Sequence, residues 1–198
     1  MTTAIKQRSE TAEQILDLAE TLIQTRGYSA FSYQDIADAL GIRKASIHYH
    51  FPSKTDLGIA VINRYIARFD AALVSIANDE GQPSMAMLDF YTQPYLQFAE
   101  TPDRVCLSAA LAGEMLALPA EIRERVEHFF KTHHAWLAKI LERGAARGEF
   151  RLRAPAAKSA RMMFGALQGA LLVKRATGDI SQINDVIAVM KSQLTASS

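Results

Sequence analysis

The sequence has little of what a disulfide-bonded, membrane-spanning or catalytic protein needs. It has a single cysteine, Cys106, which rules out an intrachain disulfide and favours a reducing cytoplasm. The longest nearly apolar run, from Met162 to Val173, is shorter than the roughly 20 residues that cross a bilayer. Because the first residues, Met1 to Glu13, are polar, we expect neither a secretory signal nor a membrane anchor.

The sequence also has no marked excess of positive or negative charge. Lysine and arginine total 22 and aspartate and glutamate total 21, so the net charge of +1 indicates nothing about nucleic acid, and only local charge can. The sequence has no glycine-rich phosphate loop, no nucleophile motif and no paired carboxylates in an apolar setting. We therefore expect a protein that is not an enzyme and that needs no cofactor.

What the sequence has throughout is helical periodicity. Apolar residues recur every three or four positions, as in Leu57, Val61, Tyr65, Phe69 and Leu73, and no stretch alternates as a strand would. Prolines 83, 102, 119 and 155 precede such stretches, with Thr101 as a candidate N-cap, and Pro94 predicts a kink or a break. The predicted fold class is all-α.

Two short helices are expected near residues 33–40 and 43–50, with Gly41 between them. Ser32 and Asp35, like Ser53 and Asp56, have the spacing of a capping box, in which each side chain satisfies a free backbone N–H. Two short helices joined by a glycine turn are typical of the helix-turn-helix, here about 31–50, whose second helix enters the DNA major groove.

The second short helix has the residues that this role requires. Ile42 and Ile47 are suited to anchor it inward, and from Gly41 through Lys54 there are three cations, two histidines and no acid. Lysine, arginine and hydroxyl groups bind phosphates, and arginine and lysine also read base edges. The residues that we expect at DNA are Ser32, Tyr33, Arg43, Lys44, Ala45, Ser46, His48, Tyr49, His50 and Lys54; Lys6 and Arg8 are candidates for further contacts.

The region from about Arg8 to Ala67 resembles the TetR (tetracycline-repressor-like) family of transcriptional regulators. The resemblance rests on the runs Ile15-Leu16-Asp17-Leu18-Ala19, Arg26-Gly27-Tyr28, Asp35-Ile36-Ala37, Leu40-Gly41-Ile42, Ser46-Ile47-His48-Tyr49-His50-Phe51 and Ser53-Lys54-Thr55-Asp56-Leu57. The family commonly has Tyr-Tyr-His-Phe followed by a lysine, whereas the first aromatic position here is His48. That departure concerns the operator sequence rather than the fold.

The resemblance implies a division of the chain. It predicts an N-terminal three-helix DNA-binding domain over 8–67 and a larger C-terminal helical domain over 68–198 that binds a small effector of unknown identity and dimerises. The protein is then a ligand-responsive regulator, most simply a repressor that binds a palindromic operator as a homodimer. The alternatives are an electrophile- or redox-sensing regulator acting through Cys106, and a helical adaptor that does not bind DNA.

Two features of the second region support that division. Residues 159–173 are apolar nearly all round, and Ile183, Ile187, Met190 and Leu194 form a stripe, so we expect a dimer through helices about 155–176 and 180–195. Methionines and aromatic residues concentrate after residue 80, which suits either an apolar ligand or an ordinary core. The candidate ligand-binding residues are Tyr91, Tyr95, Cys106, Met115, Trp136, Phe164 and Gln168.

A metal site is not expected. The candidate grouping of metal-ligand types is His128, His133 and His134 with Glu124, and no cysteine or second spaced acid completes it.

Overall fold

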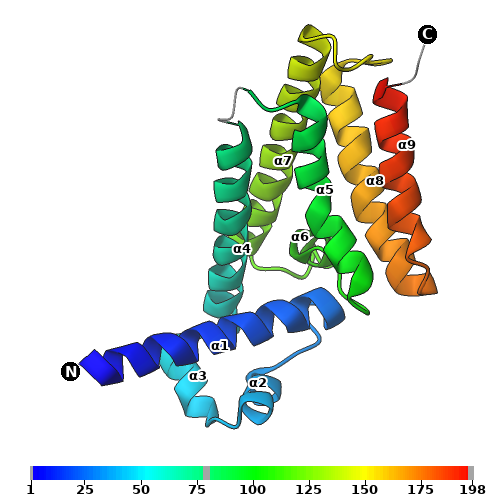
Figure 1. Cartoon of the computed structure of the whole chain (residues 1–198). Helices are drawn as coiled ribbons and strands as arrows, with labels where there is room; N and C mark the ends of the chain where they lie inside the picture. Colours follow the sequence, from blue (N-terminus) through cyan, green and yellow to red (C-terminus); the bar gives the residue numbers. More distant parts are fainter. Residues whose placement is uncertain (1, 78–80, 196–198) are drawn as a thin grey trace. The chain divides into compact units, whose positions relative to one another are not determined.

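The computed structural model describes residues 2–77 and 81–195, with side chains described over 10–76 and 81–195. These ranges hold nine α-helices and no strand, which confirms the all-α prediction. The helices are α1 (Thr2–Arg26), α2 (Tyr33–Leu40), α3 (Lys44–His50), α4 (Lys54–Ala77), α5 (Ser84–Glu100), α6 (Leu107–Ala112), α7 (Ala120–Ala146), α8 (Ala156–Thr177) and α9 (Ser181–Thr195) (Figure 1).

The chain forms two compact units, and helices α4 and α7 each contribute residues to both. The first unit takes in the chain up to Ala67 together with 107–127, and the second takes in 68–106 and 128–198. The segment 107–127 therefore packs with the N-terminal helices. The expected domain boundary between residues 67 and 68 stays a prediction.

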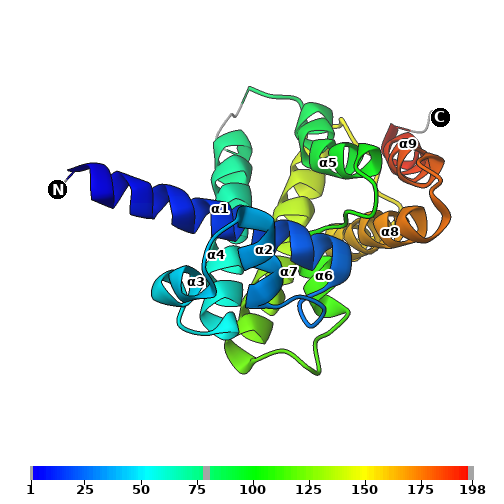
Figure 2. The same cartoon turned by 90° about the horizontal axis from the view of Figure 1, so that it is seen from below.

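In the first unit, α1 contacts α2, α3 and α6 (Figure 2). The apolar stripe of α1, with Ile15, Ala19 and Ile23, is buried. Arg64 of α4 ties that helix to α1, because its guanidinium lies 2.8 Å from the carboxylates of Glu13 and Asp17 and 3.2 Å from that of Glu20. No sequence spacing predicts these ion pairs, because the acids and Arg64 lie more than 40 positions apart.

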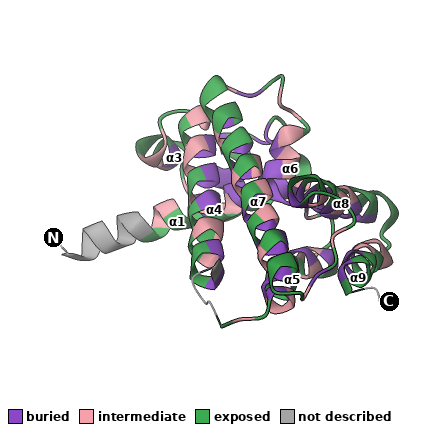
Figure 3. Cartoon of the chain, turned by 90° about the horizontal axis from the view of Figure 1, so that it is seen from above, coloured by how far each residue is buried: buried purple, intermediate pink, exposed green. Residues whose placement is uncertain are grey.

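In the second unit, α5, α8 and α9 pack on one another (Figure 1). Helix α8 ends at Gly178, whose left-handed conformation (φ 76°) lets the chain turn into α9. Figure 3 shows that the helices carry buried residues on one side and exposed residues on the other. The predicted stripe of α9 is buried in this way within its own chain, with Ile183 fully buried and Leu194 at 5% exposure.

The prolines mark most of the expected helix starts. Pro83 and Pro155 are the N-caps of α5 and α8, and Pro119 directly precedes α7. The expectation for Pro102 was wrong, because Thr101 is the C-cap of α5 and the next helix begins at Leu107.

A break at Pro94 is also not observed. Helix α5 continues through Pro94 to Glu100, with Tyr91 and Tyr95 buried on either side of the proline. Burial of these flanking residues offsets the loss of one backbone hydrogen bond at the proline.

Candidate functional site

The turn between α2 and α3 has the geometry that the sequence predicts. Helix α2 starts with a complete capping box, in which Asp35 accepts from the Ser32 backbone N–H at 2.7 Å and the Ser32 hydroxyl accepts from the Asp35 N–H. It ends at Gly41, whose φ of 65° lies in the left-handed region that favours glycine. Both ends of α2 are thus specified locally, and they set the start of α3 at Lys44.

Helix α3 buries one side and exposes the other. Ile47 is fully buried and anchors the helix, while Ile42 is half-buried. The exposed side chains Arg43, Lys44, Ala45, His48 and Tyr49 form what we call the α3 face, and Ser46 and His50 are half-buried at its edge. The α3 face carries two permanent cations and no acid, so it offers an anion a favourable surface.

Two other predicted DNA contacts are engaged within the protein. The Tyr33 ring is buried, its hydroxyl donates to the Phe51 carbonyl at 2.8 Å, and burial raises the pKa of Tyr33 to about 12. The Lys54 ammonium donates to the Phe31 carbonyl and lies 4.3 Å from the centre of the Phe31 ring. Tyr33 and Lys54 are the first residues of α2 and α4, and these contacts stabilise the N-terminal ends of both helices.

A shallow hollow is lined by residues from these two helix ends and from α3. They are Phe31, Ser32, Tyr33, Lys44, His48 and Lys54. The Nδ1 of His48 lies 3.1 Å from the Pro52 carbonyl, which can only accept, so Nδ1 carries the proton. That bond and the contact with the Tyr33 ring, 4.7 Å between centres, fix the orientation of His48.

Glu114 links the helix-turn-helix to a distant part of the chain. Its carboxylate accepts the backbone N–H groups of Tyr28 at 2.6 Å and Ser29 at 2.9 Å. Between α1 and this pair, Gly27 has φ +98°, and a Cβ there would lie 2.3 Å from the Glu114 carboxylate. The turn that follows α1 is therefore shaped around a residue 86 positions away.

In the second unit, five of the seven candidate ligand residues come together. They are Tyr91 and Tyr95 from α5, Trp136 from α7, and Phe164 and Gln168 from α8, and with His133 of α7 they form what we call the α5–α7–α8 cluster. The Tyr91 and Trp136 rings stack at 5.2 Å with planes 14° apart, and His133 lies 5.7 Å from the Phe164 ring. All six residues are buried.

The polar atoms of the cluster are joined by hydrogen bonds. The Tyr91 hydroxyl lies 2.8 Å from Nδ1 of His133, and the Gln168 amide donates to the Tyr95 hydroxyl at 3.1 Å. Burial, with a smaller effect of His134, lowers the pKa of His133 to about 3, and burial raises the pKa of Tyr91. The cluster is therefore uncharged at neutral pH.

The other two candidates lie elsewhere. Met115 belongs to the first unit and is half-exposed after α6. The Cys106 side chain is 3% exposed and lies just before α6 rather than inside a helix. A reagent dissolved in water has no direct access to so buried a sulfur, which fits a small core residue better than a sensor.

An exposed apolar surface runs along α8 and α9. Helix α8 is not covered on all sides by its own chain: Met162, Leu172 and Val173 are 42–52% exposed, and Ile180 and Val189, which follow in the loop after α8 and in α9, are 52% and 53% exposed. A Cβ added at Gly165 or Gly169 would meet nothing within 4 Å. We call this surface the α8–α9 face.

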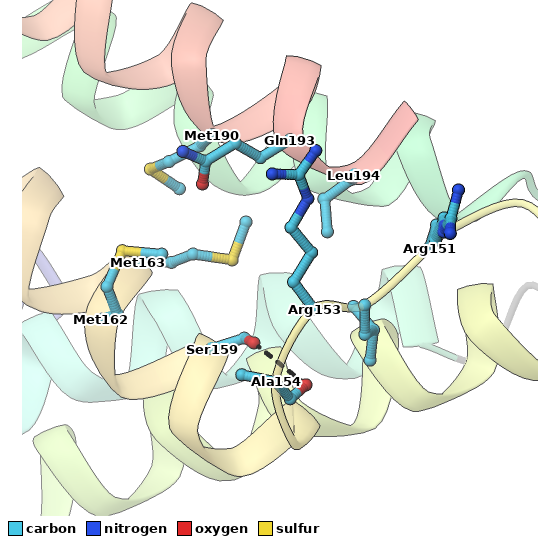
Figure 4. Close-up of a pocket in the computed structure, with 10 residues that line it drawn as sticks. Arg151, Arg153, Ala154, Ser159, Met162, Met163, Met190, Gln193 and Leu194 are labelled. Carbon is cyan, nitrogen blue, oxygen red and sulfur yellow. Dashed lines mark hydrogen bonds between the residues drawn. The ribbon is translucent and has the colours of Figure 1, made fainter. Parts of the chain in front are cut away.

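One end of the α8–α9 face is hollowed (Figure 4). Figure 4 shows Met162, Met163 and Met190 on one side of this hollow and the Arg153 side chain on the other. Sulfur-containing and guanidinium side chains at such a place adapt readily to an opposing surface.

Among the residues with described placement, no three histidine, cysteine, aspartate or glutamate side chains are grouped to hold a metal ion. A search of those same residues finds no helix long and apolar enough to span a membrane.

Comparisons with known proteins agree on one family. Residues 15–61 match the model of the bacterial regulatory proteins of the tetR family, and residues 85–190 match the model of the tetracyclin repressor-like C-terminal domain. The chain belongs to the TetR family. The resemblance seen in the first 67 residues thus extends over most of the protein.

Solved TetR-family structures share the whole fold. A TetR-family regulator from Agrobacterium tumefaciens is 33% identical, with a TM-score of 0.89 over 96% of this chain and 100% of that one. A TetR regulator from Legionella pneumophila is 32% identical, with a TM-score of 0.83 over 92% of this chain and 96% of that one.

Named relatives include repressors. The transcriptional repressor NemR of Escherichia coli is 22% identical over 92% of this chain and 93% of its own length. The negative transcriptional regulator IcaR of the biofilm operon icaADBC in Staphylococcus aureus is 24% identical over 60% of this chain and 68% of its own length. This TetR-family protein is a DNA-binding transcriptional regulator, as the helix-turn-helix pattern predicts.

Two residues of the sites were missed by sequence reasoning. Glu114 is a single acid in an irregular segment, and His133 was considered only as a metal ligand. The signal for His133 was its place on an apolar stripe with Phe129 and Trp136, where a histidine is buried and neutral. No local signal marks Glu114, because its partners are backbone groups far away in the chain.

Proposed function

We propose that this TetR-family protein represses transcription by binding a palindromic operator as a homodimer, and that a small molecule bound in the C-terminal region releases it. The α3 face is the observation that carries the proposal. It is exposed, it is held rigidly by Ile47 and by the caps of α2, and it has no acid. Repression is supported by the names of the relatives NemR and IcaR.

The residues divide by the kind of DNA contact that their chemistry allows. Arg43, Lys44 and Ser46 are proposed to reach base edges, with Ala45 small enough to allow close approach or to meet a thymine methyl group. Tyr49 and His50 are proposed to bind phosphates, together with Ser32 and His48 at the hollow, whose wall Tyr33 and Lys54 form from within the protein. Lys6 and Arg8 remain candidates whose side chains lie outside the described residues.

The dimer is proposed to form through α8 and α9, within the ranges 155–176 and 180–195. The support is the α8–α9 face, which exposes large apolar side chains around two glycines that leave room for a second backbone. A two-fold dimer presents two α3 helices, which is why the operator should be palindromic. Because the proposed partner is chromosomal DNA, we expect the protein to act in the cytoplasm.

The effector is proposed to bind at the α5–α7–α8 cluster. An effector releases DNA only if it prefers the conformation in which the two α3 helices no longer match successive major grooves. The support for this location is that polar and aromatic side chains from three helices converge there without charge.

The decisive experiment is selection of fragmented genomic DNA on the purified protein, followed by measurement of affinity against salt. Enrichment of one short two-fold motif is the expected result. Binding without a shared motif would leave only a general attraction to phosphate, and no binding at all would contradict the proposal.

A further inference from the structure

The imidazole of His48 on the α3 face is held by one of its two nitrogens. Nδ1 lies 3.1 Å from the Pro52 carbonyl oxygen, which only accepts, so Nδ1 carries a hydrogen. The Tyr33 ring packs edge-on against the imidazole, with 4.7 Å between ring centres and 63° between the planes. Among the described residues, Nε2 has no hydrogen-bond partner, and His48 is exposed. One nitrogen is therefore committed to the protein, and the other is available to DNA.

The bond to Pro52 decides what Nε2 can do. A neutral imidazole has one N–H donor and one acceptor nitrogen, so in neutral His48 the acceptor is Nε2. Phosphate oxygens are acceptors as well, and two acceptors form no hydrogen bond. When Nε2 binds a proton, both nitrogens donate: Nδ1 keeps its bond to Pro52, and Nε2 offers a phosphate a charge-assisted hydrogen bond. A phosphate contact from His48 therefore requires one proton from the solvent.

The groups around this imidazole keep their charge while a histidine titrates. Histidine ordinarily changes its charge between about pH 5 and about pH 8. Lys44 and Lys54 line the same hollow and are cations throughout that range, and Tyr33 stays neutral because burial raises its pKa to about 12. The acids in the first turns of α2 and α4, Asp35 and Asp56, accept hydrogen bonds from the serine before each helix. Of these groups, the imidazole alone changes its charge near neutral pH, and a phosphate beside it favours the charged form.

We propose that His48 couples DNA binding to proton uptake: its Nε2 binds one proton as it meets a backbone phosphate at the hollow beside α3. The DNA-bound protein then holds more protons than the unbound protein, so its affinity for DNA rises as pH falls and declines as pH rises. The residue type decides this, because the Tyr-Tyr-His-Phe pattern common in the family has a tyrosine here, and a tyrosine hydroxyl donates without taking up a proton. The coupling rests on the proposed function, in which His48 binds a phosphate.

The measurement is the affinity for duplex DNA between about pH 6 and about pH 8, at one low ionic strength. Two duplexes are compared, the operator and a duplex of random sequence. Phosphate contacts carry no sequence information, so we expect the same pH dependence on both. For each α3 helix bound, the association constant should fall by up to about tenfold per unit rise in pH. Affinity that does not change with pH would overturn the proposal, as would affinity that rises with pH, the sign expected if Nε2 accepts from a base amino group.

Substitutions assign the pH dependence to one residue. His48→Tyr places a hydroxyl donor at the same exposed position, and His48→Gln places an amide donor there, so both should bind DNA with little dependence on pH. The matched control is His128→Tyr, at an exposed position of α7, which should retain the wild-type dependence. Thermal unfolding verifies that each variant is folded. Wild-type pH dependence in both folded His48 variants would contradict the assignment.

His50 is the other imidazole of α3 and provides a second control. Among the described residues, no hydrogen bond fixes the position of its ring proton, so a neutral His50 can present an N–H to a phosphate. His50→Gln should therefore keep most of the wild-type pH dependence. Loss of the dependence in His50→Gln, together with its retention in His48→Tyr, would place the proton on His50 and overturn the proposal.

Selection of genomic DNA fragments is carried out on the same preparations, so that the two ideas fail separately. Absence of a shared motif would contradict operator recognition, and the random duplex would still report proton uptake by His48. A shared motif bound equally well at every pH would overturn the role of His48, with operator recognition intact. No binding to either duplex at any pH would overturn both.

Discussion

The α3 face and the α5–α7–α8 cluster are built in opposite ways. Every side chain of the α3 face comes from seven consecutive positions, 43–49, and projects into solvent. The cluster instead gathers residues up to 77 positions apart, from Tyr91 to Gln168, and buries all of them. A recognition surface on one short helix needs only that helix to be correctly placed, whereas a buried polar site needs three helices to meet in register.

The difference has a consequence for substitutions. Changes at exposed positions should act through a partner and leave the stability of the fold nearly unchanged. Changes in the buried cluster should alter stability first, because its polar atoms are out of water and depend on hydrogen-bond partners from other helices.

The largest effect that we expect comes from Gly165→Arg, on the exposed side of α8. The site is open within the chain, and arginine favours a helix over glycine by about 1 kcal/mol, so the folded protomer should not be destabilised. The dimer should dissociate, and operator affinity should fall by about a hundredfold or more because the two α3 helices then bind independently. Sedimentation and gel-shift titration measure the two quantities.

Ala135→Arg is the matched control, since it adds the same side chain to an exposed position of α7. Unchanged dimerisation in Gly165→Arg would show that the α8–α9 face is not the interface.

The next effect concerns pH and the buried histidine. The folded pKa of His133 is about 3, below the unfolded value of about 6.5, so protons bind the unfolded chain preferentially and stability is lost as pH falls through that interval. Between about pH 7 and about pH 5, the free energy of unfolding should drop by about 2 kcal/mol from this residue. Urea titrations at several pH values measure the slope.

The His133→Phe variant should lose this contribution to the slope, while His128→Phe, at an exposed position of the same helix, should keep it. If the slopes of wild type and His133→Phe coincide, His133 is not held neutral by burial.

The helix-turn-helix region is not wholly local, because the turn after α1 depends on one distant residue, Glu114. Replacing Glu114 with alanine removes the acceptor for the Tyr28 and Ser29 N–H groups and should lower the free energy of unfolding by about 1–2 kcal/mol. Gly27→Ala should cost about as much, through its positive φ and its contact with Glu114.

The two substitutions should be non-additive, because alanine at 114 removes the atoms that the new Cβ would meet. Glu124→Gln, at an exposed position of α7, serves as the control. Strict additivity in the double-mutant cycle would mean that Gly27 and Glu114 act separately.

Two residues of the α3 face, Arg43 and Lys44, are proposed to read base edges. Arg43→Ala and Lys44→Ala should each relax the preference at one base pair by about 1–3 kcal/mol. A variant that instead weakens binding to every sequence, and lowers the slope of affinity against salt by about 1 on logarithmic axes, has lost a phosphate contact. Titrations with operator and single-base variants, with Lys139→Ala as control, decide which residue reads sequence.

The sequence was most informative where structure is local. The bounds of α2 and α3, both capping boxes and the inward direction of Ile47 follow from residues within a few positions of one another. The expected N-cap at Thr101 and the expected break at Pro94 were wrong, because α5 continues through Pro94 and ends at Thr101. The α9 stripe was read correctly as apolar, but the structure shows that it packs within its own chain.

By itself the sequence determined an all-helical chain, the helix-turn-helix and its cation-bearing second helix, because caps, a turn glycine and helical periodicity act over a single turn. Only the tertiary structure decided that Lys54 and Tyr33 are held inside the protein, that Glu114 caps a turn 86 residues away, and that His133 joins Tyr91. The physical reason is that hydrogen bonding and burial depend on which atoms meet in space, and no periodicity in the chain records a meeting between distant helices.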